Sequence, residues 1–370
     1  GAPGKGGDAG TPDAGTSSAV DAGGPPPLQD DGGDPPAPAP DAGGPTQVVL
    51  ALYTGSQDSY DALASFHESL TAVGEELYTL QNDGTITGSD PLGARAAANA
   101  DGLQALATVS NYNPSIGDYD ASLAHAAMVT YESAFVANAL KLAQNGGFQG
   151  IDLDFEGVAY SKNVADDRAA YSSLAHDLAT ALHAAGLQLV LSVPRKTADN
   201  ASDTWSYPYD FAGLAADADA LLYMTYDENG PWDQPGPVAG ADWVKSCLTY
   251  ATSVVSPAKL LLGLPNYGYD WDISASNFGA QKYVGTQVAW KDIPALLAKP
   301  GVTSVWDAPT SSPHFAYVAT DGHAHEVWYE NVQSIDAKVS LGASFGVGGI
   351  AVSALGNEDA SFWQAALSAP

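Results

Sequence analysis

The chain has 370 residues, of which 45% are hydrophobic, enough to bury the core of one large domain or two ordinary ones. Its 43 acidic residues against 13 Lys and Arg give a formal net charge of -30, which argues against nucleic acid or an anionic membrane surface as a partner. The single cysteine, Cys247, excludes an internal disulfide and a multi-thiol zinc site, and the apolar runs are too short to span a bilayer.

Residues 1–46 consist almost wholly of Gly, Ala, Pro, Asp, Ser and Thr, which bury too little apolar surface to offset the entropy cost of ordering. We expect a disordered linker there, followed by one folded domain at residues 47–370. The chain starts at Gly1 without Met or a signal-like core, which predicts processing or truncation. We therefore expect an exported protein, extracellular or tethered to the cell envelope through the linker, for example by a lipid anchor on a preceding segment. The alternative is that residues 1–46 are a leader added for expression and not a natural linker.

From Thr46 onward, apolar strands alternate with Ala-rich amphipathic stretches, which is the pattern of repeated βα units. We predict strands at 48–53, 77–81, 103–110, 150–156, 187–193, 219–227, 259–267 and 348–353, and helices at 59–73, 120–144 and 166–185. Eight strands with intervening helices predict an α/β fold, the (β/α)8 TIM barrel. The long interval before the last strand predicts a small α+β insertion at about residues 272–330.

The fourth predicted strand carries Asp152, Asp154 and Glu156 at alternate positions between apolar residues. Because side chains alternate across a strand, the three acids share one face and the apolar residues share the other. In a closed parallel barrel the acids then point inward, and Glu156 lies nearest the carboxyl-end rim, where such barrels do chemistry. Three like charges within about 13 Å repel one another, so their clustering needs a purpose or a cation. An edge strand with a solvated acidic face is the alternative.

Other strand ends add polar and aromatic side chains at the same predicted rim. The sixth strand ends in Met224-Thr225-Tyr226-Asp227, and the seventh ends in Gly263-Leu264-Pro265-Asn266-Tyr267-Gly268. The first strand ends in Tyr53 and the third is followed by Asn111. Because these ends meet at one rim of a parallel barrel, packing alone does not explain their combination.

The chain resembles the family 18 glycoside hydrolases, the chitinase superfamily, through three motifs in the family's order. The family's DGxDxDxE appears as residues 149–156, its MxYD as residues 224–227 and its GxPxYG as residues 263–268. Further strings resemble the spore-germination and cortex-lytic branch, whose members cleave peptidoglycan glycan, often as N-acetylglucosaminidases. These strings are 192–206, 227–238, 325–330 and 348–359.

The resemblance implies substrate-assisted hydrolysis of a β-linked N-acetylglucosamine glycan, with retention of the anomeric configuration and no cofactor or metal. Glu156 would protonate the glycosidic oxygen and later activate water. The substrate's own 2-acetamido carbonyl would attack the anomeric carbon, and Asp154 would stabilise the resulting oxazolinium ion. Tyr226 would orient the acetamido group, and Asp152 would share a proton with Asp154. Asp227 would bind the sugar or take part in the hydrogen-bond network around it.

Aromatic rings near the rim are expected to stack on pyranose rings. The candidates are Tyr53, Tyr112, Trp232, Tyr267, Tyr269 and Trp271. Among the Trp residues, Trp232 is expected to contact ligand because it follows the Tyr226–Asp227 pair directly. Trp306 and Trp328 either line the cleft or fill the core of the insertion. The predicted substrate contacts are Asp227, Trp232, Tyr267, Tyr53 and Asn111.

Two positions depart from the family pattern. Gln149 replaces the first Asp of the acid motif, far from the rim, where the loss of charge is expected to tune the carboxylate network rather than abolish it. Ser353 stands where family members carry the Trp that forms the floor under the reacting sugar. This puts efficient action on chitin in question, unless another aromatic such as Trp363 substitutes.

Several functions remain open on the sequence. Peptidoglycan is the favoured substrate, and a chitinase or an endo-β-N-acetylglucosaminidase acting on N-glycans is the alternative. A lectin-like relative would bind without cutting, but such relatives lose the acid or its partner carboxylate, whereas Glu156 and Asp154 are present. Three acids could also ligate Mg²⁺ or Ca²⁺, but no His pair accompanies them. We expect a monomer that binds a polysaccharide, without nucleic acid or a membrane span.

Overall fold

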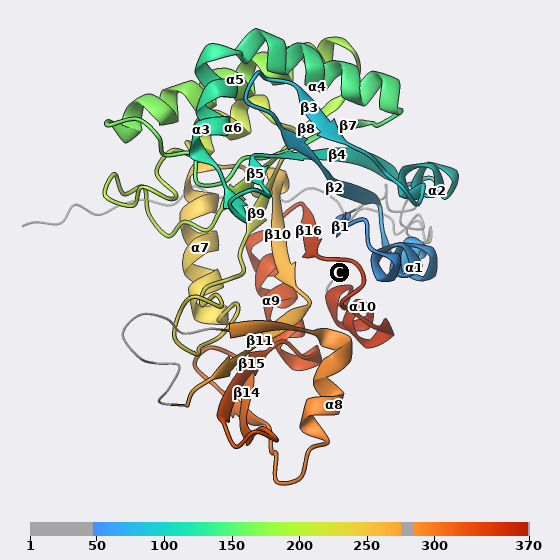
Figure 1. Cartoon of the computed structure of the whole chain (residues 1–370), viewed down its shortest axis with the longest axis vertical. Coiled ribbons are helices and arrows are strands. Elements are labelled where there is room, and N and C mark those ends of the chain that lie inside the picture. The colour runs from blue at the N-terminus through green and yellow to red at the C-terminus, as the bar shows by residue number, and fades with distance from the viewer. Residues whose placement is uncertain (1–46, 275–284, 369–370) are drawn as a thin grey trace, which may run out of the picture. The chain divides into compact units, whose positions relative to one another are not determined.

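The computed structural model describes residues 47–274 and 285–368, so the predicted linker at residues 1–46 lies outside the described residues. Eight strands form a closed barrel: β1 Val48–Tyr53, β2 Ala72–Leu80, β4 Gln104–Ser110, β7 Gly150–Asp154, β8 Gln188–Pro194, β9 Ala220–Met224, β10 Leu260–Pro265 and β16 Gly349–Ser353. Each is parallel to its neighbours, and pairing of β1 with both β2 and β16 closes the ring. The predicted TIM barrel is confirmed (Figure 1).

Alternation along the strands separates two apolar layers. Leu50 and Leu52 of β1 and Leu106 of β4 pack together in the barrel interior. The intervening residues, such as Val49 and Ala51, face the surrounding helices and join the larger core. A fully buried Leu side chain contributes about 2 kcal/mol relative to an exposed one, so these two layers supply much of the stabilisation of the barrel.

Helices and short strands connect the barrel strands. The helices are α1 Gln57–Phe66, α2 Ala94–Ala100, α3 Ala121–His125, α4 Glu132–Gly146, α5 Val164–Ala184, α6 Phe211–Asp217, α7 Ala241–Val254, α9 Val332–Phe345 and α10 Ala360–Ala366. The short strands are β3 Ile86–Gly88, paired with β2, and the hairpin of β5 Tyr112–Asn113 with β6 Asp118–Tyr119. Gly147 ends α4 in a left-handed conformation (φ 73°), which glycine adopts without strain. None of the helices in the described ranges has the length and apolarity to cross a membrane.

Two predicted helices differ from the structure. The helix predicted at 59–73 ends as α1 at Phe66, and β2 begins at Ala72 instead of residue 77. Residues 72–75 pair with both β1 and β4, so barrel pairing overrides the helical pattern of the local sequence. The helix predicted at 120–144 is interrupted by a π-helical turn at Ala126–Thr130.

The predicted insertion is a five-stranded antiparallel sheet with one short helix. Its elements are β11 Tyr267–Asp272, β12 Gly285–Ala289, α8 Ile293–Leu297, β13 Val305–Asp307, β14 Ser312–Val318 and β15 Ala324–Tyr329, with the strand order β12-β11-β15-β14-β13. Ile293, Phe315 and Val327 fill its own small core. Figure 1 shows this sheet in orange and red beyond β10. Because β11 begins at Tyr267, directly after β10, the insertion starts earlier than the predicted residue 272.

Candidate active site

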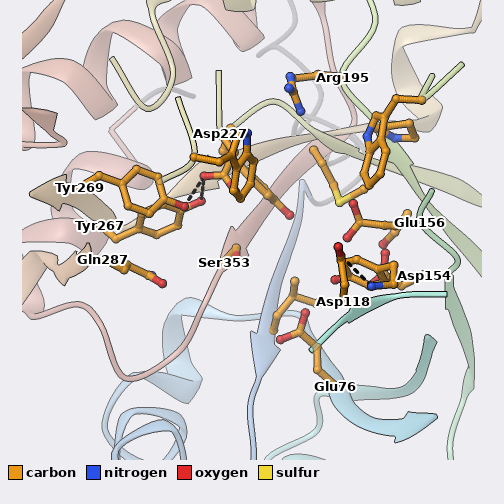
Figure 2. Close-up of a pocket in the computed structure, with 18 residues that line it drawn as sticks. Glu76, Asp118, Asp154, Glu156, Arg195, Asp227, Tyr267, Tyr269, Gln287 and Ser353 are labelled. Carbon is orange, nitrogen blue, oxygen red and sulfur yellow. Dashed lines mark hydrogen bonds between the residues drawn. The ribbon is translucent and has the colours of Figure 1, made fainter. Parts of the chain in front are cut away.

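A cavity of about 550 Å³ lies at the carboxyl ends of the barrel strands (Figure 2). Leu52, Pro194, Met224 and Ser353, which stand at or next to the last position of β1, β8, β9 and β16, contribute to its wall. Of the residues predicted from the sequence, the cavity brings together Asp154, Glu156, Tyr226, Asp227, Trp232, Tyr267 and Tyr269. Asp152, Tyr53 and Asn111 do not line it.

Asp152 is fully buried next to the cavity and is held by the two neighbouring strands. Its Oδ2 accepts a hydrogen bond from the Thr108 hydroxyl at 3.1 Å, and its Oδ1 accepts one from the Ser192 hydroxyl at 3.0 Å. Gly74 makes room for this network, since a Cβ there would lie 2.9 Å from Thr108 Oγ1. Burial raises the pKa of Asp152 to about 6, although both hydroxyls favour the charged form. Asp152 is therefore an anchored part of the barrel interior.

Asp154, two residues further along the same face, is in a different state. It is 7% exposed, and its Oδ1 is buried with no hydrogen-bond partner among the described residues. Burial raises its pKa well above the ordinary value, and the charges of Glu156 and Asp152 raise it further. Proton sharing between Asp152 and Asp154 stays a prediction. A buried acceptor without a partner is available to a ligand donor.

Glu156 follows β7 at the rim and is half-buried. Burial raises its pKa to about 7, whereas the nearby Tyr119 hydroxyl favours the charged form. Asn111 fixes the Glu156 backbone from both sides. Asn111 Nδ2 donates to the Glu156 carbonyl at 2.7 Å, and the Glu156 N–H donates to Asn111 Oδ1 at 2.8 Å. The buried Asn111, predicted as a substrate contact, thus lies where it positions Glu156.

Asp227 and its tyrosine partners form the opposite wall, as Figure 2 shows. Tyr267 and Tyr269, two positions apart on β11, donate their hydroxyl hydrogens to Asp227 Oδ1 at 2.7 and 2.8 Å. Asp227 has a left-handed backbone (φ 55°), which Asp tolerates better than most residues. This turn allows Asp227 and the adjacent Tyr226 to line the same cavity, against the alternation of a regular strand.

Tyr226 depends on a glycine in the neighbouring strand. A Cβ on Gly263 of β10 would lie 2.8 Å from Tyr226 Cε1 and 2.5 Å from the Tyr223 carbonyl oxygen. The glycine of the GxPxYG string is therefore needed to seat the Tyr226 ring. Burial raises the pKa of the Tyr226 hydroxyl well above its ordinary value, so it is a neutral hydrogen-bond donor.

The predicted aromatic contacts separate into two groups. Trp232, 58% exposed, lines the cavity together with Tyr267 and Tyr269. Tyr53 is fully buried and belongs to the helix-facing core, because its neighbour Leu52 takes the inward position at the end of β1. Trp271 is buried within the apolar cluster of the insertion. Among the remaining candidates, Tyr112, Trp306 and Trp328 do not line the cavity.

The two departures from the family pattern lie in different surroundings. Gln149 precedes β7 at the amino-terminal end of the barrel, where its Oε1 accepts a hydrogen bond from the Ala105 N–H at 2.7 Å. Ser353 lines the cavity. Trp363 does not, since it is buried on α10 against Phe66 and Phe362. Trp363 therefore does not replace the missing floor.

Several cavity residues are missing from the sequence prediction. They are Glu76, Asp118, Tyr119, Arg195, Trp205 and Gln287 of β12. Glu76 faces the cavity from a β-bulge that shifts the register of β2 between Glu75 and Tyr78. Its side chain is exposed to the cavity, whose walls partly desolvate it. This desolvation raises its pKa to about 8, with the Asp152 and Glu156 charges adding to the effect.

The acidic residues do not assemble into a metal centre in the part of the chain that the structure describes. No group of three or more His, Cys, Asp and Glu side chains there could hold a metal ion. The cavity instead offers a carboxyl with a pKa near neutrality, a second carboxyl with an unpaired oxygen, and a neutral tyrosine hydroxyl. This set can donate a proton and stabilise a developing positive charge.

Comparisons with known proteins agree on the family of the chain. The sequence profile of "Glycosyl hydrolases family 18" matches residues 58–358. The chain is 34% identical over 320 residues to the uncharacterized glycosylase YvbX of Bacillus subtilis, covering 86% of this chain and 90% of the relative. A chitinase structure from Chromobacterium violaceum is 40% identical, with a TM-score of 0.80 and coverage of 86% and 98%. The Bacillus cereus spore cortex-lytic enzyme SleL is 25% identical, with a TM-score of 0.79 and coverage of 87% and 73%.

Proposed function

The chain belongs to glycosyl hydrolase family 18 and is a glycoside hydrolase, and we propose that it cleaves β-linked N-acetylglucosamine glycans through an oxazolinium intermediate. One observation carries the proposal. Asp154 leaves a buried carboxyl oxygen without a hydrogen-bond partner in the described structure, in the same cavity as Glu156 and Tyr226. An acetamido N–H is the donor that this oxygen would accept from an N-acetylated sugar.

The first step breaks the glycosidic bond. Glu156 donates its carboxyl proton to the glycosidic oxygen, for which a pKa of about 7 is suited near neutral pH. The carbonyl oxygen of the 2-acetamido group attacks the anomeric carbon as the leaving sugar departs with the bonding electron pair. The product is an oxazolinium ion, and a hydrogen bond from its N–H to Asp154 stabilises the positive charge.

The second step restores the acetamido group. The Glu156 carboxylate takes a proton from water, and the water oxygen attacks the anomeric carbon from the face that the leaving sugar has vacated. The bond between the anomeric carbon and the carbonyl oxygen breaks, and two inversions give net retention. No second carboxylate nucleophile is needed, so this scheme is one of the exceptions to two-carboxylate glycoside hydrolysis.

The opposite wall holds the substrate in position for the attack. The Tyr226 hydroxyl is a neutral donor that can bind the acetamido carbonyl oxygen and align it with the anomeric carbon. Asp227 is held in place by Tyr267 and Tyr269 and remains within reach of a sugar hydroxyl through its other oxygen. Trp232 presents an exposed ring for stacking against a pyranose.

Peptidoglycan is the favoured substrate within this proposal, with export of the enzyme because that polymer lies outside the cytoplasmic membrane. The likeness to the spore cortex-lytic enzyme SleL supports this choice. Cleavage of chitin is the second candidate, supported by the 40% identity to the Chromobacterium violaceum chitinase. The presence of Ser353 in the cavity wall in place of an aromatic floor weighs against efficient action on chitin.

Product analysis tests the proposal. The enzyme is incubated with purified peptidoglycan and, separately, with chitin oligosaccharides, and the products are identified by mass spectrometry. We expect peptidoglycan fragments that end in a reducing N-acetylglucosamine. Products from chitin alone would replace the favoured substrate by the second candidate, and no products from either polymer would contradict the proposed function. Proton NMR of the first product is expected to show the β anomer.

A further inference from the structure

Arg195 differs from the other charged residues of the cavity. The remaining charged side chains that line it are acidic: Glu76, Asp118, Asp154, Glu156 and Asp227. Arg195 is half-buried, and no hydrogen bond or ion pair joins its side chain to any residue within the described ranges. Figure 2 shows its guanidinium group directed into the space between the Asp227 wall and Glu156. In a chain with 43 acids and 13 Lys and Arg, such a cation is available to a ligand.

The backbone around Arg195 is fixed by its neighbours. Pro194 precedes it at the end of β8 and restricts the chain. The Lys196 N–H donates to the Tyr223 hydroxyl oxygen at 3.1 Å, and that hydroxyl donates to the Lys196 carbonyl at 2.6 Å. The Lys196 ammonium is itself buried and pairs with Asp199 at 2.5 Å. Of two consecutive cations, the fold thus uses one for its own stability and presents the other to the cavity.

Arg195 lies close to the position of the bond that is cleaved. Burial raises the pKa values of Glu156 and Asp227, and the Arg195 charge acts against this increase in both groups. Trp205, 41% exposed, lines the same cavity and is adjacent to Glu156, since a Cβ on Gly157 would lie 2.9 Å from the Trp205 ring. Because Glu156 protonates the oxygen between two sugars, Arg195 and Trp205 face a sugar that borders this oxygen.

We propose that Arg195 binds a carboxylate on the amino sugar next to the cleaved bond and thereby selects acidic glycans over neutral chitin. This inference rests on the proposed function and identifies the chemical group of the substrate that the site recognises. The carboxylate is the free carboxylate of the lactyl group of N-acetylmuramic acid, as in a glycan strand without stem peptides, and chitin lacks this group. A guanidinium group matches the planar geometry of a carboxylate with two parallel N–H donors, and an ammonium group does not.

The acidic surroundings are compatible with an anionic substituent. Burial raises the pKa of Glu76 to about 8 and also raises the pKa values of Asp154 and Asp227. Glu76, with a pKa of about 8, is mostly protonated near neutral pH, so the negative charge of the wall is smaller than its composition indicates. The guanidinium charge is independent of pH in this range.

The test compares two soluble tetrasaccharides of equal length. One is chitotetraose, and the other alternates N-acetylglucosamine with N-acetylmuramic acid that carries free lactyl carboxylates. We expect R195Q to raise KM for the acidic tetrasaccharide about tenfold or more and to change kcat/KM for chitotetraose less than about twofold. R195K is expected to fall between wild type and R195Q. The advantage of wild type over R195Q on the acidic substrate should decrease with added salt.

Lys245 provides the matched control. It lies exposed on α7, outside the cavity lining, so K245Q removes the same charge without touching the site. K245Q is expected to resemble wild type on both substrates, which would exclude an effect of overall net charge. Circular dichroism of R195Q checks the fold, and R195K keeps the test valid if R195Q is unstable.

The outcomes separate this inference from the proposed function. Equal losses on both substrates, or none, would overturn the role of Arg195 while leaving the glycosidase function intact. Equal losses with a shifted pH profile would assign Arg195 to tuning Glu156 instead. Wild-type cleavage of chitotetraose alone would also overturn the inference. A wild-type enzyme that cuts neither tetrasaccharide, nor any longer N-acetylglucosamine glycan, would contradict the proposed function itself.

Discussion

The two walls of the cavity hold their carboxyl groups in opposite states. On one wall, Asp227 Oδ1 accepts hydrogen bonds from both Tyr267 and Tyr269. On the other, Asp154 Oδ1 is buried without a partner in the described structure, and Glu156 has a pKa raised by burial to about 7. The tyrosine wall is therefore organised before substrate binds, whereas the acid wall is completed by the substrate.

This difference indicates separate roles for the two walls. The tyrosine hydroxyls favour the charged form of Asp227 and counter the rise in pKa that burial causes. The acid wall has no such compensation for Asp154, whose pKa is raised first by burial and then by Glu156 and Asp152. In the proposed mechanism, the acid wall transfers the proton and stabilises the developing charge, and the tyrosine wall positions the substrate.

The largest expected effect is the loss of the proton donor. E156Q keeps the shape of the side chain but cannot donate or accept the catalytic proton, so kcat should fall by about a thousandfold or more. Steady-state hydrolysis of chitin oligosaccharides measures this change. E76Q, a carboxyl-to-amide change in the same cavity, is the matched comparison and is expected to retain most of the wild-type activity. Near-normal turnover of folded E156Q would contradict the role assigned to Glu156.

The next effect concerns the two aspartates of β7. In the proposed mechanism the Asp154 carboxylate stabilises the oxazolinium ion, so kcat of D154N should fall by about a hundredfold. D152N leaves the cavity lining unchanged but disturbs the hydrogen bonds from Thr108 and Ser192, so it should act more on thermal stability than D154N does. Kinetics and thermal denaturation of both variants measure the contrast. A larger kinetic loss in D152N would reverse the two roles.

A smaller effect is expected on the tyrosine wall. Y267F and Y269F each remove one of two hydrogen bonds to Asp227, so each should lower kcat/KM by about tenfold, mainly through KM. Tyr53 is a matched control, because its hydroxyl is buried without a hydrogen-bond partner in the described residues and does not line the cavity. Y53F should leave kcat/KM unchanged. A loss in Y53F equal to that in Y267F would instead support the substrate contact that the sequence predicts for Tyr53.

The smallest effect is a shift in pH dependence. With a Glu156 pKa of about 7, kcat/KM of the wild type should decrease as the pH rises above that value, because the proton donor ionises. An ionised Glu76 nearby would raise the pKa of Glu156, so E76Q should lower it and move this decrease to lower pH, by about half a unit. The shift is small because Glu76, with a pKa of about 8, is mostly protonated near neutrality. A shift to higher pH would contradict the coupling.

The sequence predicts the acid strand well because β7 is regular. Its period-two pattern places Asp152 and Asp154 on the inner face, as the hydrogen bonds from Thr108 and Ser192 confirm for Asp152. The eight strands and the insertion also follow from hydrophobic patterning and from the spacing between strands seven and eight. The motif strings identify Tyr226 and Asp227 at the rim, where the structure places both.

Other parts of the site depend on local irregularities that periodicity does not show. Glu76 faces the cavity through a bulge in a strand that the sequence assigns partly to a helix. Tyr53 is the last residue of β1 and follows the inward-facing Leu52, so its side chain faces the helices. The sequence does not show which of these two adjacent residues faces the barrel interior. Arg195 becomes notable only because it has no partner in the described three-dimensional structure, and its pattern in the sequence is an ordinary pair of cations.

Participation of the acetamido group is the central claim, and a fluorinated substrate series tests it most directly. Chitobiose glycosides with an acetamido, fluoroacetamido, difluoroacetamido or trifluoroacetamido group at the reacting sugar differ in the electron density of the attacking carbonyl oxygen. Because the carbonyl acts as the nucleophile, kcat/KM should decrease steeply with each added fluorine. The same decrease should persist in Y267F, which alters only the positioning wall. A kcat/KM that does not change along the series would contradict substrate-assisted catalysis by this enzyme.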